Sequence, residues 1–125
     1  MKEIIVTLPD TAESKQIVDW LNANDSTEYQ ALIGECRIMK AANSKPLSYL
    51  LSRVVEMVAV APNPEADEFQ RAESVRQLVK AVVLQASQAG IKEVWFRGDD
   101  AVLNRMAERH EFEKVEGPVF RLRIP

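Results

Sequence analysis

The segments VVEMVAVAP (residues 54–62) and VRQLVKAVVLQASQAGIKEVWF (residues 75–96) decide the fold of this chain. The first is a run of β-branched and small apolar residues, which is typical of a strand. In the second, apolar residues recur at intervals of three and four from Val75 to Ala86, which predicts a helix with one buried face. Gly90 follows as the C-cap, and the bulky residues after Lys92 predict another strand.

The flanking residues predict the other elements. We expect strands near residues 4–8, 36–41, 47–51, 54–60, 92–97, 112–115 and 119–124, and helices near 11–23, 27–33 and 101–110. The first helix should begin at Asp10, with Glu13 three residues later completing a capping box. The strands between 36 and 60 would form an antiparallel meander. In the last strand apolar residues alternate with arginines, so one face should be buried and the other solvated.

Length and composition suit a small globular protein. The chain has 125 residues, and we expect a single domain over 1–125. Hydrophobic residues make up 46% and charged residues 28%, a balance typical of folded rather than disordered chains. The net charge of -3 provides no attraction to nucleic-acid phosphates or anionic lipid, so we expect neither nucleic acid nor membrane as a partner.

Cys36 is the single cysteine, so no internal disulfide can form and a reducing compartment is indicated. No apolar run approaches the roughly 18 residues of a membrane helix, and the start does not resemble a signal peptide. We therefore expect a soluble, cytoplasmic protein. Cys36 falls on a predicted strand without an obvious histidine partner, so we interpret it as a core residue rather than a nucleophile. The spacings predict no metal site and no Ser-His-Asp arrangement.

The order of elements over residues 54–115 resembles that of the GNAT superfamily of N-acetyltransferases. In that family a V-x-V-x-P-like strand precedes a loop R/Q-x-x-G-x-G/A, a helix, a glycine, a strand, a short helix and a Tyr…Gly-Phe ending. Here the strand reads VAVAP at 58–62, the loop QRAESV at 70–75, the junction AGIKEVW at 89–95 and the ending RHEFEKV at 109–115. The resemblance implies a mixed α/β (α+β) fold, with a mostly antiparallel central sheet of about six to seven strands flanked by about four helices.

The resemblance also implies a site for acetyl-CoA or another acyl-CoA. The strand that holds Val58 and Val60 is expected to splay from its neighbour and pair with the pantetheine amides. The simpler interpretation, which we favour, is that both side chains are core. The loop is expected to hold the pyrophosphate with backbone N–H groups at a helix N-terminus. The corresponding positions are Gln70, Arg71, Ala72, Glu73, Ser74, Val75 and Arg76. Glu73 and Val75 occupy the two glycine positions, which weakens anion binding, and Arg71 and Arg76 offset part of the negative charge.

A different local structure is left open for this segment. Asn63 is a good N-cap and Pro64 a good first helical residue, so residues 64–89 can form one long helix or two helices in series. In that case no phosphate loop exists, and no cofactor would be expected.

The catalytic positions are incomplete. The resemblance places Glu56 near the family's general base. The alternative interpretations are a charged residue on an exposed strand face and an ion pair with Arg53. Ala107 stands where a tyrosine commonly protonates the departing thiolate, and Glu111 replaces the glycine of the Gly-Phe pair. His110 is the single histidine and a candidate acid or base, although a helix C-terminus alone explains a histidine there.

Two functions remain open from the sequence. In the first, the chain transfers an acyl group from CoA to an amine whose identity the sequence does not indicate. In the second, it is a catalytically inactive GNAT-fold module for binding or assembly. The final strand leaves a homodimer open as a further alternative.

Overall fold

The computed structural model describes residues 3–24, 30, 33–53, 56–97, 109, 112–116 and 119–124. In chain order its elements are β1 (Ile5–Thr7), the 3-10 helix η1 (Thr11–Glu13), α1 (Ser14–Ala23), β2 (Arg37–Ala42), β3 (Pro46–Ser52), β4 (Glu56–Pro62), α2 (Glu68–Gln88), β5 (Glu93–Arg97), β6 (Glu113–Glu116) and β7 (Val119–Arg123). The predicted helices at 27–33 and 101–110 lie mostly outside the described residues.

The strands form one seven-stranded sheet in the order β1-β2-β3-β4-β5-β7-β6. All neighbouring strands are antiparallel except β4 and β5, which are parallel and joined by α2. This confirms the predicted α+β fold with a mostly antiparallel sheet, and it confirms the meander of β2, β3 and β4. A parallel pair needs a crossover connection, and the amphipathic pattern after Val75 supplies the helix for it.

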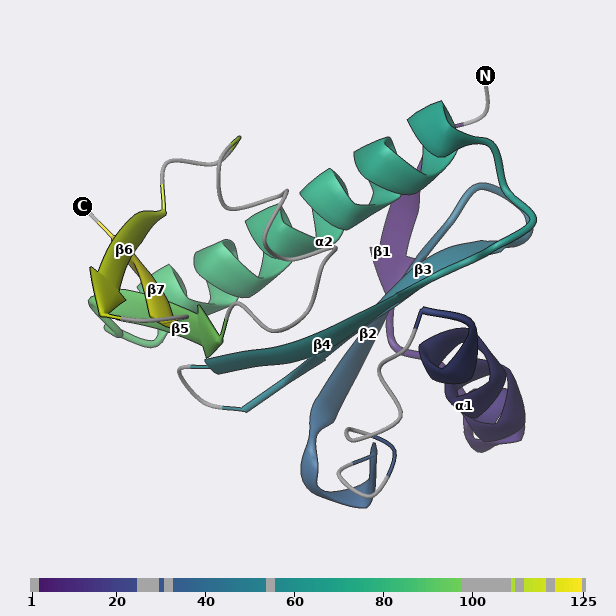
Figure 1. Cartoon of the computed structure of the whole chain (residues 1–125), viewed down its shortest axis with the longest axis horizontal. Coiled ribbons are helices and arrows are strands. Elements are labelled where there is room, and N and C mark those ends of the chain that lie inside the picture. Colours follow the sequence, from purple (N-terminus) through teal and green to yellow (C-terminus); the bar gives the residue numbers. More distant parts are fainter. Residues whose placement is uncertain are drawn as a thin grey trace.

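The two α-helices cover opposite faces of the central strands (Figure 1). β3 and β4 lie between them and are buried at nearly every position. This explains why both strands are continuous apolar runs in the sequence, whereas the last strand, with one open face, alternates. No helix in the described part of the chain is long and apolar enough to cross a bilayer.

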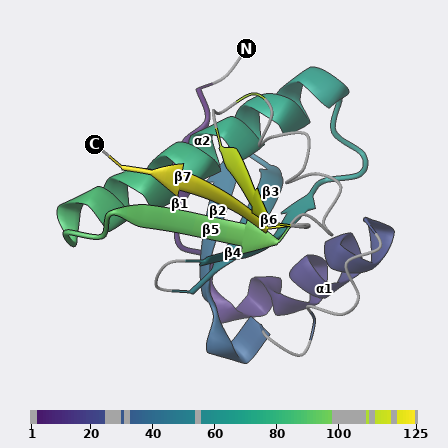
Figure 2. The ribbon, with the colours of Figure 1, turned by 60° about the vertical axis from the view of Figure 1, so that its left-hand side comes forward.

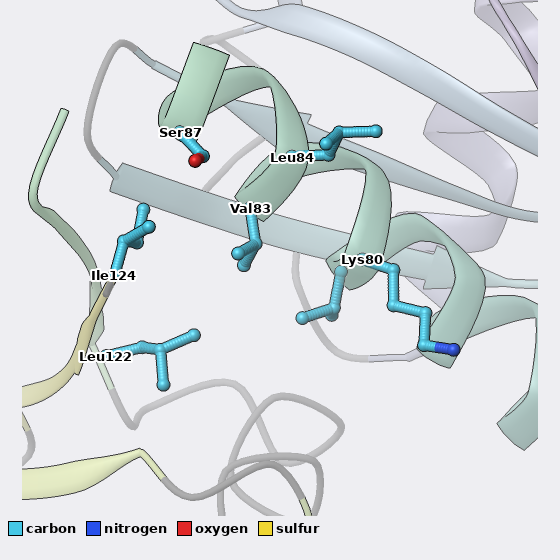
Figure 3. Close-up of a pocket in the computed structure, with 7 residues that line it drawn as sticks. Lys80, Val83, Leu84, Ser87, Leu122 and Ile124 are labelled. Atoms are coloured by element: carbon cyan, nitrogen blue, oxygen red, sulfur yellow. The ribbon is translucent and has the colours of Figure 1, made fainter. Parts of the chain in front are cut away.

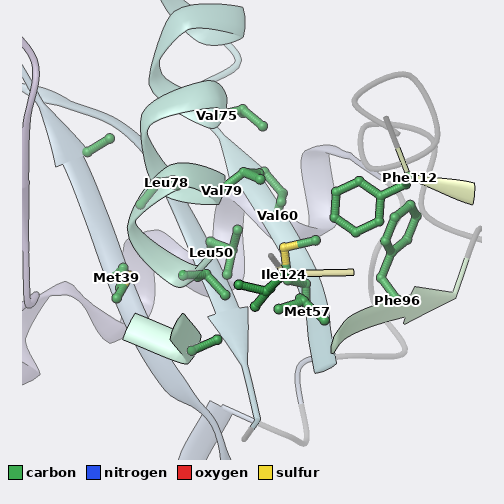
Figure 4. Packing of buried hydrophobic residues seen from close by; sticks show 14 residues of the cluster. Met39, Leu50, Met57, Val60, Val75, Leu78, Val79, Phe96, Phe112 and Ile124 are labelled. Atoms are coloured by element: carbon green, nitrogen blue, oxygen red, sulfur yellow. The ribbon is translucent and has the colours of Figure 1, made fainter. Parts of the chain in front are cut away.

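The α2 side holds the larger core cluster, which is shown in Figure 4. Val75, Leu78, Val79, Val82 and Ala86 are buried on one face of α2, as their spacing predicts. The aromatic part of the cluster is built on β5: the ring centroid of Phe96 lies 5.1 Å from that of Phe112 and 4.9 Å from that of Phe120. These contacts join the last two strands to the α2 side of the sheet.

The α1 side holds the second cluster, formed by Ile17, Trp20 and Leu21 of α1 against β3 and β4. Asp10 caps η1 by accepting a hydrogen bond from the Ala12 N–H at 3.0 Å, as predicted. The predicted capping box is wrong for Glu13, because its carboxylate turns to the sheet and binds Lys40 at 2.6 Å. The tertiary ion pair replaces the local hydrogen bond.

The C-terminal end of α2 follows the sequence prediction. Gly90 has a φ of 76°, which a residue with a side chain rarely adopts. Its N–H donates to the Ser87 carbonyl at 3.1 Å, and the Ile91 N–H donates to the Ala86 carbonyl at 2.9 Å. These two bonds end the helix and direct the chain into β5.

Candidate functional site

The parallel pair at the centre of the sheet is short. β4 pairs with β5 at Glu56↔Trp95 and Met57↔Phe96, and β5 ends at Arg97. The other edge of β4 stays paired with β3 as far as Pro62. Within the described residues, the β5-facing edge of β4 therefore has no partner strand from Val58 to Pro62. Figure 1 shows β4 continuing past the end of β5, and Figure 2 shows β5, β7 and β6 in front of the other strands.

A β-bulge lies where the two strands separate. Leu51 pairs with Ala59, but the next residue, Ser52, pairs with Met57, so Val58 is an extra residue on β4. The bulge shifts the alternation of side chains: Met57 and Val60 face α2, whereas Val58 and Ala59 pack in the α1-side cluster. Bulges bend a strand and change the direction of its side chains, and they often occur beside functional sites.

Val58 and Val60 are both buried, with 6% and 0% of their surface exposed. Their side chains thus belong to the core, which was one of the two interpretations open from the sequence. Pairing with a ligand's amides uses the backbone of β4 rather than these side chains, so the open edge keeps the other interpretation available.

Glu56 is the first residue of β4, next to the point of separation. Its backbone closes the β3–β4 turn with Arg53, through hydrogen bonds of 2.7 and 3.3 Å. The expected ion pair with Arg53 is wrong, because Arg53 instead binds Glu35 at 3.0 Å. Among the described residues, no hydrogen bond or ion pair engages the half-buried side chain of Glu56.

A row of side chains crosses the sheet on the face opposite α2. Cross-strand pairing aligns Glu56 with Trp95, Trp95 with Arg121, and Arg121 with Glu113. The Arg121 guanidinium lies 5.7 Å from the centre of the Trp95 ring, a cation–π distance, and its Nε donates to Glu113 at 2.9 Å. Arg121 thereby lowers the pKa of the Glu113 carboxyl. Glu56 stands at the end of this row nearest the open edge.

Two arginines of β7 pair with the same carboxylate. Arg121 and Arg123 both contact Glu113, Arg123 at 3.6 Å. The side chain of Arg97 and the whole of His110, Ala107 and Glu111 lie outside the described residues.

The predicted phosphate loop at Gln70–Val75 is wrong. These residues lie in the first turns of α2, which begins at Glu68. The other interpretation, one long helix over residues 64–89, is confirmed except for its start: α2 begins at Glu68, because Asp67 rather than Asn63 is the N-cap and accepts the Gln70 N–H at 2.8 Å. The Asn63 side chain instead accepts the Glu65 N–H at 2.9 Å in a turn before the helix. Inside the helix, the backbone N–H groups of residues 71–76 donate to carbonyls of the helix, so they cannot form a nest that binds an anion.

Within α2 the predicted loop residues have structural partners. The Arg76 Nε donates a hydrogen bond to the Glu73 carboxylate at 2.9 Å. The hydrogen bonds from Arg76 lower the pKa of Glu73 to about 2. The Arg71 guanidinium donates to the Pro64 carbonyl at 3.3 Å. Val75 is buried in the core, Gln70 is half-buried and Ala72 is exposed.

Ser74 has a role that the sequence interpretation missed. It is fully buried, accepts a hydrogen bond from Ser48 of β3 at 2.8 Å, and donates to the Arg71 carbonyl. The small hydroxyl pair lets α2 approach the sheet closely. Its position four residues before Leu78, on the buried helical face, was the available signal.

Cys36 packs half-buried against the α1-side cluster. Burial raises the pKa of its thiol, and Arg53 acts in the opposite direction without overcoming it. A thiol with a raised pKa is a poor nucleophile at neutral pH, which agrees with a packing role.

An open groove of about 390 Å³ lies elsewhere, between α2 and β7 (Figure 3). Its lining is Val79, Lys80, Val83, Leu84, Ser87, Leu122 and Ile124. Lys80 is the one ionisable side chain of this lining, and none of the predicted site residues contributes to it. Within the described residues, no group of three or more potential metal ligands occurs either.

Comparison with known proteins is informative at the level of structure. No family model and no curated protein sequence matches the chain. An acetyltransferase of the GNAT family from Staphylococcus aureus Mu50 superposes with a TM-score of 0.73 and 7% identity, covering 98% of this chain and 100% of that one. The chain has the GNAT fold.

Two further GNAT-fold structures are similar over nearly the whole chain. The ribosomal-protein-S18-alanine N-acetyltransferase of Escherichia coli has a TM-score of 0.71 at 14% identity, covering 98% of this chain and 94% of that one. The yncA protein of Salmonella typhimurium, solved with its cofactor acetyl-CoA, has a TM-score of 0.63 at 13% identity with the same coverage. At these identities the likeness shows the fold alone.

Proposed function

We propose that this GNAT-fold chain transfers an acyl group from a thioester, acetyl-CoA or a related acyl donor, to an amine. The observation that carries the proposal is the edge of β4 beyond Met57, which has no partner strand among the described residues and lies beside a β-bulge at Val58. An edge of unpaired N–H and C=O groups can pair with the two amides of a pantetheine arm, as an added strand would.

The similarity to GNAT-fold structures supports an acyl-CoA as the donor. One of the similar proteins was solved with acetyl-CoA and another is a ribosomal-protein alanine N-acetyltransferase, although each of these properties belongs to that protein. The inactive module is not favoured by this similarity, because the similar structures named above include acetyltransferases.

In the proposed reaction, the amine nitrogen attacks the thioester carbonyl carbon. A C–N bond forms, the C–S bond breaks, and the thiolate leaves with the electron pair. Glu56 accepts the proton that the nitrogen loses, directly or through one water, and solvent supplies the proton for the thiolate. Glu56 suits this role because its carboxylate is next to the strand separation and has no partner among the described residues.

The acceptor approaches from the face that carries Glu56 and Trp95, since α2 covers the opposite face. Glu93 and Glu113 add negative charge to this face, and Arg121 neutralises part of it. A carboxylate beside an aromatic ring favours an acceptor that arrives as an ammonium ion, which loses one proton to solvent before the neutral amine attacks. The identity of the amine is a matter for a screen.

The test is release of free thiol from acetyl-CoA in the presence of a panel of primary amines. Glu56→Gln should reduce kcat by roughly 10²–10⁴-fold, the usual contribution of a general base, while the melting temperature stays within a degree or two of the wild type. Glu35→Gln, which removes a nearby exposed carboxylate paired with Arg53, is the matched control and should be fully active. Equal losses in the two variants would remove Glu56 from the mechanism.

A further inference from the structure

The turn between β4 and α2 lies directly before the helix N-terminus, where an anion is favoured, and its own hydrogen bonds occupy most of its N–H groups. The Asn63 N–H donates to Leu47 at 2.7 Å, and the Ala66 N–H donates to the Asn63 carbonyl at 3.2 Å. The Glu65 N–H is bound by the Asn63 side chain at 2.9 Å, and Pro64 has none to donate. An anion placed here would have to break bonds that the turn already makes.

At the start of α2, two further N–H groups have partners within the chain. The Gln70 N–H is bound by the Asp67 carboxylate at 2.8 Å, and the Arg71 N–H donates to the Asp67 carbonyl at 3.0 Å. The Asp67 carboxylate thus occupies the positive end of the helix dipole, where a ligand phosphate would otherwise be stabilised.

The charge of this region opposes an anion as well. Glu65, Asp67 and Glu68 are exposed within four consecutive positions. Arg71 is the single cation between residues 63 and 73, and its guanidinium is turned to the Pro64 carbonyl. The nucleotide part of CoA carries a pyrophosphate and a 3′-phosphate, so like charges would face one another.

The β5-facing edge of β4 beyond Met57 has none of these obstacles among the described residues. From Val58 to Pro62 the edge lacks a partner strand within the described residues, and the groups it offers are neutral backbone amides. A pantetheine arm is neutral and carries amides of its own, so it can pair with this edge whichever group is attached at its phosphate end.

We infer that the chain recognises its acyl donor through the thioester and the pantetheine arm, and that the nucleotide phosphates of CoA add no affinity. The donor class is therefore an acylated pantetheine-type thiol, with acetyl-CoA acting only as one carrier of that arm. This inference rests on the proposed acyl transfer and specifies its substrate.

The experiment compares three probes on the full chain: acetyl-CoA, acetyl-pantetheine and adenosine 3′,5′-bisphosphate. Acetyl-pantetheine should have a kcat/KM within about threefold of that of acetyl-CoA, and the bisphosphate at millimolar concentration should neither inhibit nor shift the melting temperature. A preference for acetyl-CoA of about 30-fold or more, or inhibition by the bisphosphate, overturns the inference while the acyl transfer stands. Failure of both thioesters to bind or react overturns the proposed function, and this inference with it.

A charge variant gives an independent readout. Glu65→Gln with Glu68→Gln should raise kcat/KM for acetyl-CoA several-fold at low ionic strength and leave acetyl-pantetheine unchanged, and added salt should remove the difference. Asp67 is kept because it caps α2. The matched control, Glu3→Gln with Asp19→Asn, removes two exposed carboxylates elsewhere and should change neither donor. Equal effects of the two double variants on acetyl-CoA would contradict a local repulsion.

Discussion

Tyr49 is buried under the first helical segment and ties it to the sheet. Its hydroxyl donates to the Glu13 carboxylate at 2.8 Å and lies 2.7 Å from the side-chain oxygen of Gln16. Burial, and then the hydrogen bond to Glu13, raise the pKa of Tyr49, so it stays protonated as a donor. Lys40 completes the network at 2.6 Å from Glu13. These three partners come from η1, α1 and β2, which no local sequence pattern links.

Tyr49→Phe should lower the free energy of unfolding by about 1 kcal/mol, because it removes one hydrogen bond and leaves a charged acceptor with one partner fewer. Urea unfolding measures this change. The ring contact with Trp20, at 5.1 Å between centroids, is retained in the variant and controls for packing. A loss below about 0.3 kcal/mol would mean that water replaces the hydroxyl without penalty.

Glu13 should also contribute to the acid sensitivity of the protein. Burial alone would raise its pKa, but the hydrogen bonds from Lys40 and Tyr49 outweigh that effect and lower it below the ordinary value of 4.5. A carboxyl with a lowered folded pKa stabilises the fold above its unfolded pKa, and this stabilisation is lost as pH falls through the folded value. Unfolding followed between pH 7 and pH 3 should therefore show a smaller loss of stability in Glu13→Gln than in the wild type. An identical pH slope in both proteins would contradict the ion pair with Lys40.

At the scale of elements, the buried faces could be predicted from the sequence and one helix start could not. The periodicity from Val75 to Ala86 and the glycine at 90 located the body and end of α2, because both depend on local pattern. The start was misplaced because Asn63 and Asp67 are both good N-caps, and because the resemblance assigned residues 70–75 to a loop. The tertiary bonds of Asn63 to Pro46 and Leu47 decide between the two caps.

Substitutions at Asp67 test this start of α2. Asp67→Ala should lower the free energy of unfolding by about 1 kcal/mol, because the Gln70 N–H loses its acceptor. Asp67→Asn keeps a capping oxygen and should lower the free energy of unfolding by only about a few tenths of a kcal/mol. Thermal unfolding of the two variants separates the cap from the charge. Equal losses in both would indicate that charge, rather than capping, stabilises this end.

At the scale of the whole molecule, the order of elements identified the fold, but the site depends on pairings distant in sequence. The sequence predicted β4 and β5 as separate strands and placed Glu56 near the reaction centre. It could not show that the two strands share only two residue pairs, that Val58 forms a bulge, or that Glu56, Trp95, Arg121 and Glu113 align across four strands. Register of this kind is set by the packing of both cores and not by local composition.

The two halves of the sheet meet at this short parallel pair. β1 to β4 are held by both helices, whereas Phe96, Phe112 and Phe120 hold β5, β7 and β6 on the α2 side. A ligand in the opening would contact both halves, so donor binding should raise the melting temperature of the whole chain. For a domain of this size, a ligand at about 100 times its dissociation constant adds roughly 2.7 kcal/mol, equivalent to several degrees.

Amide hydrogen exchange, followed by NMR with and without saturating acetyl-CoA, tests the central claim most directly. If the pantetheine arm pairs with the open edge of β4, exchange should slow at amides between Val58 and Pro62 and stay unchanged from Glu65 to Gln70. Unchanged exchange along β4, or protection confined to Glu65–Gln70, would contradict a donor held by its arm beside β4.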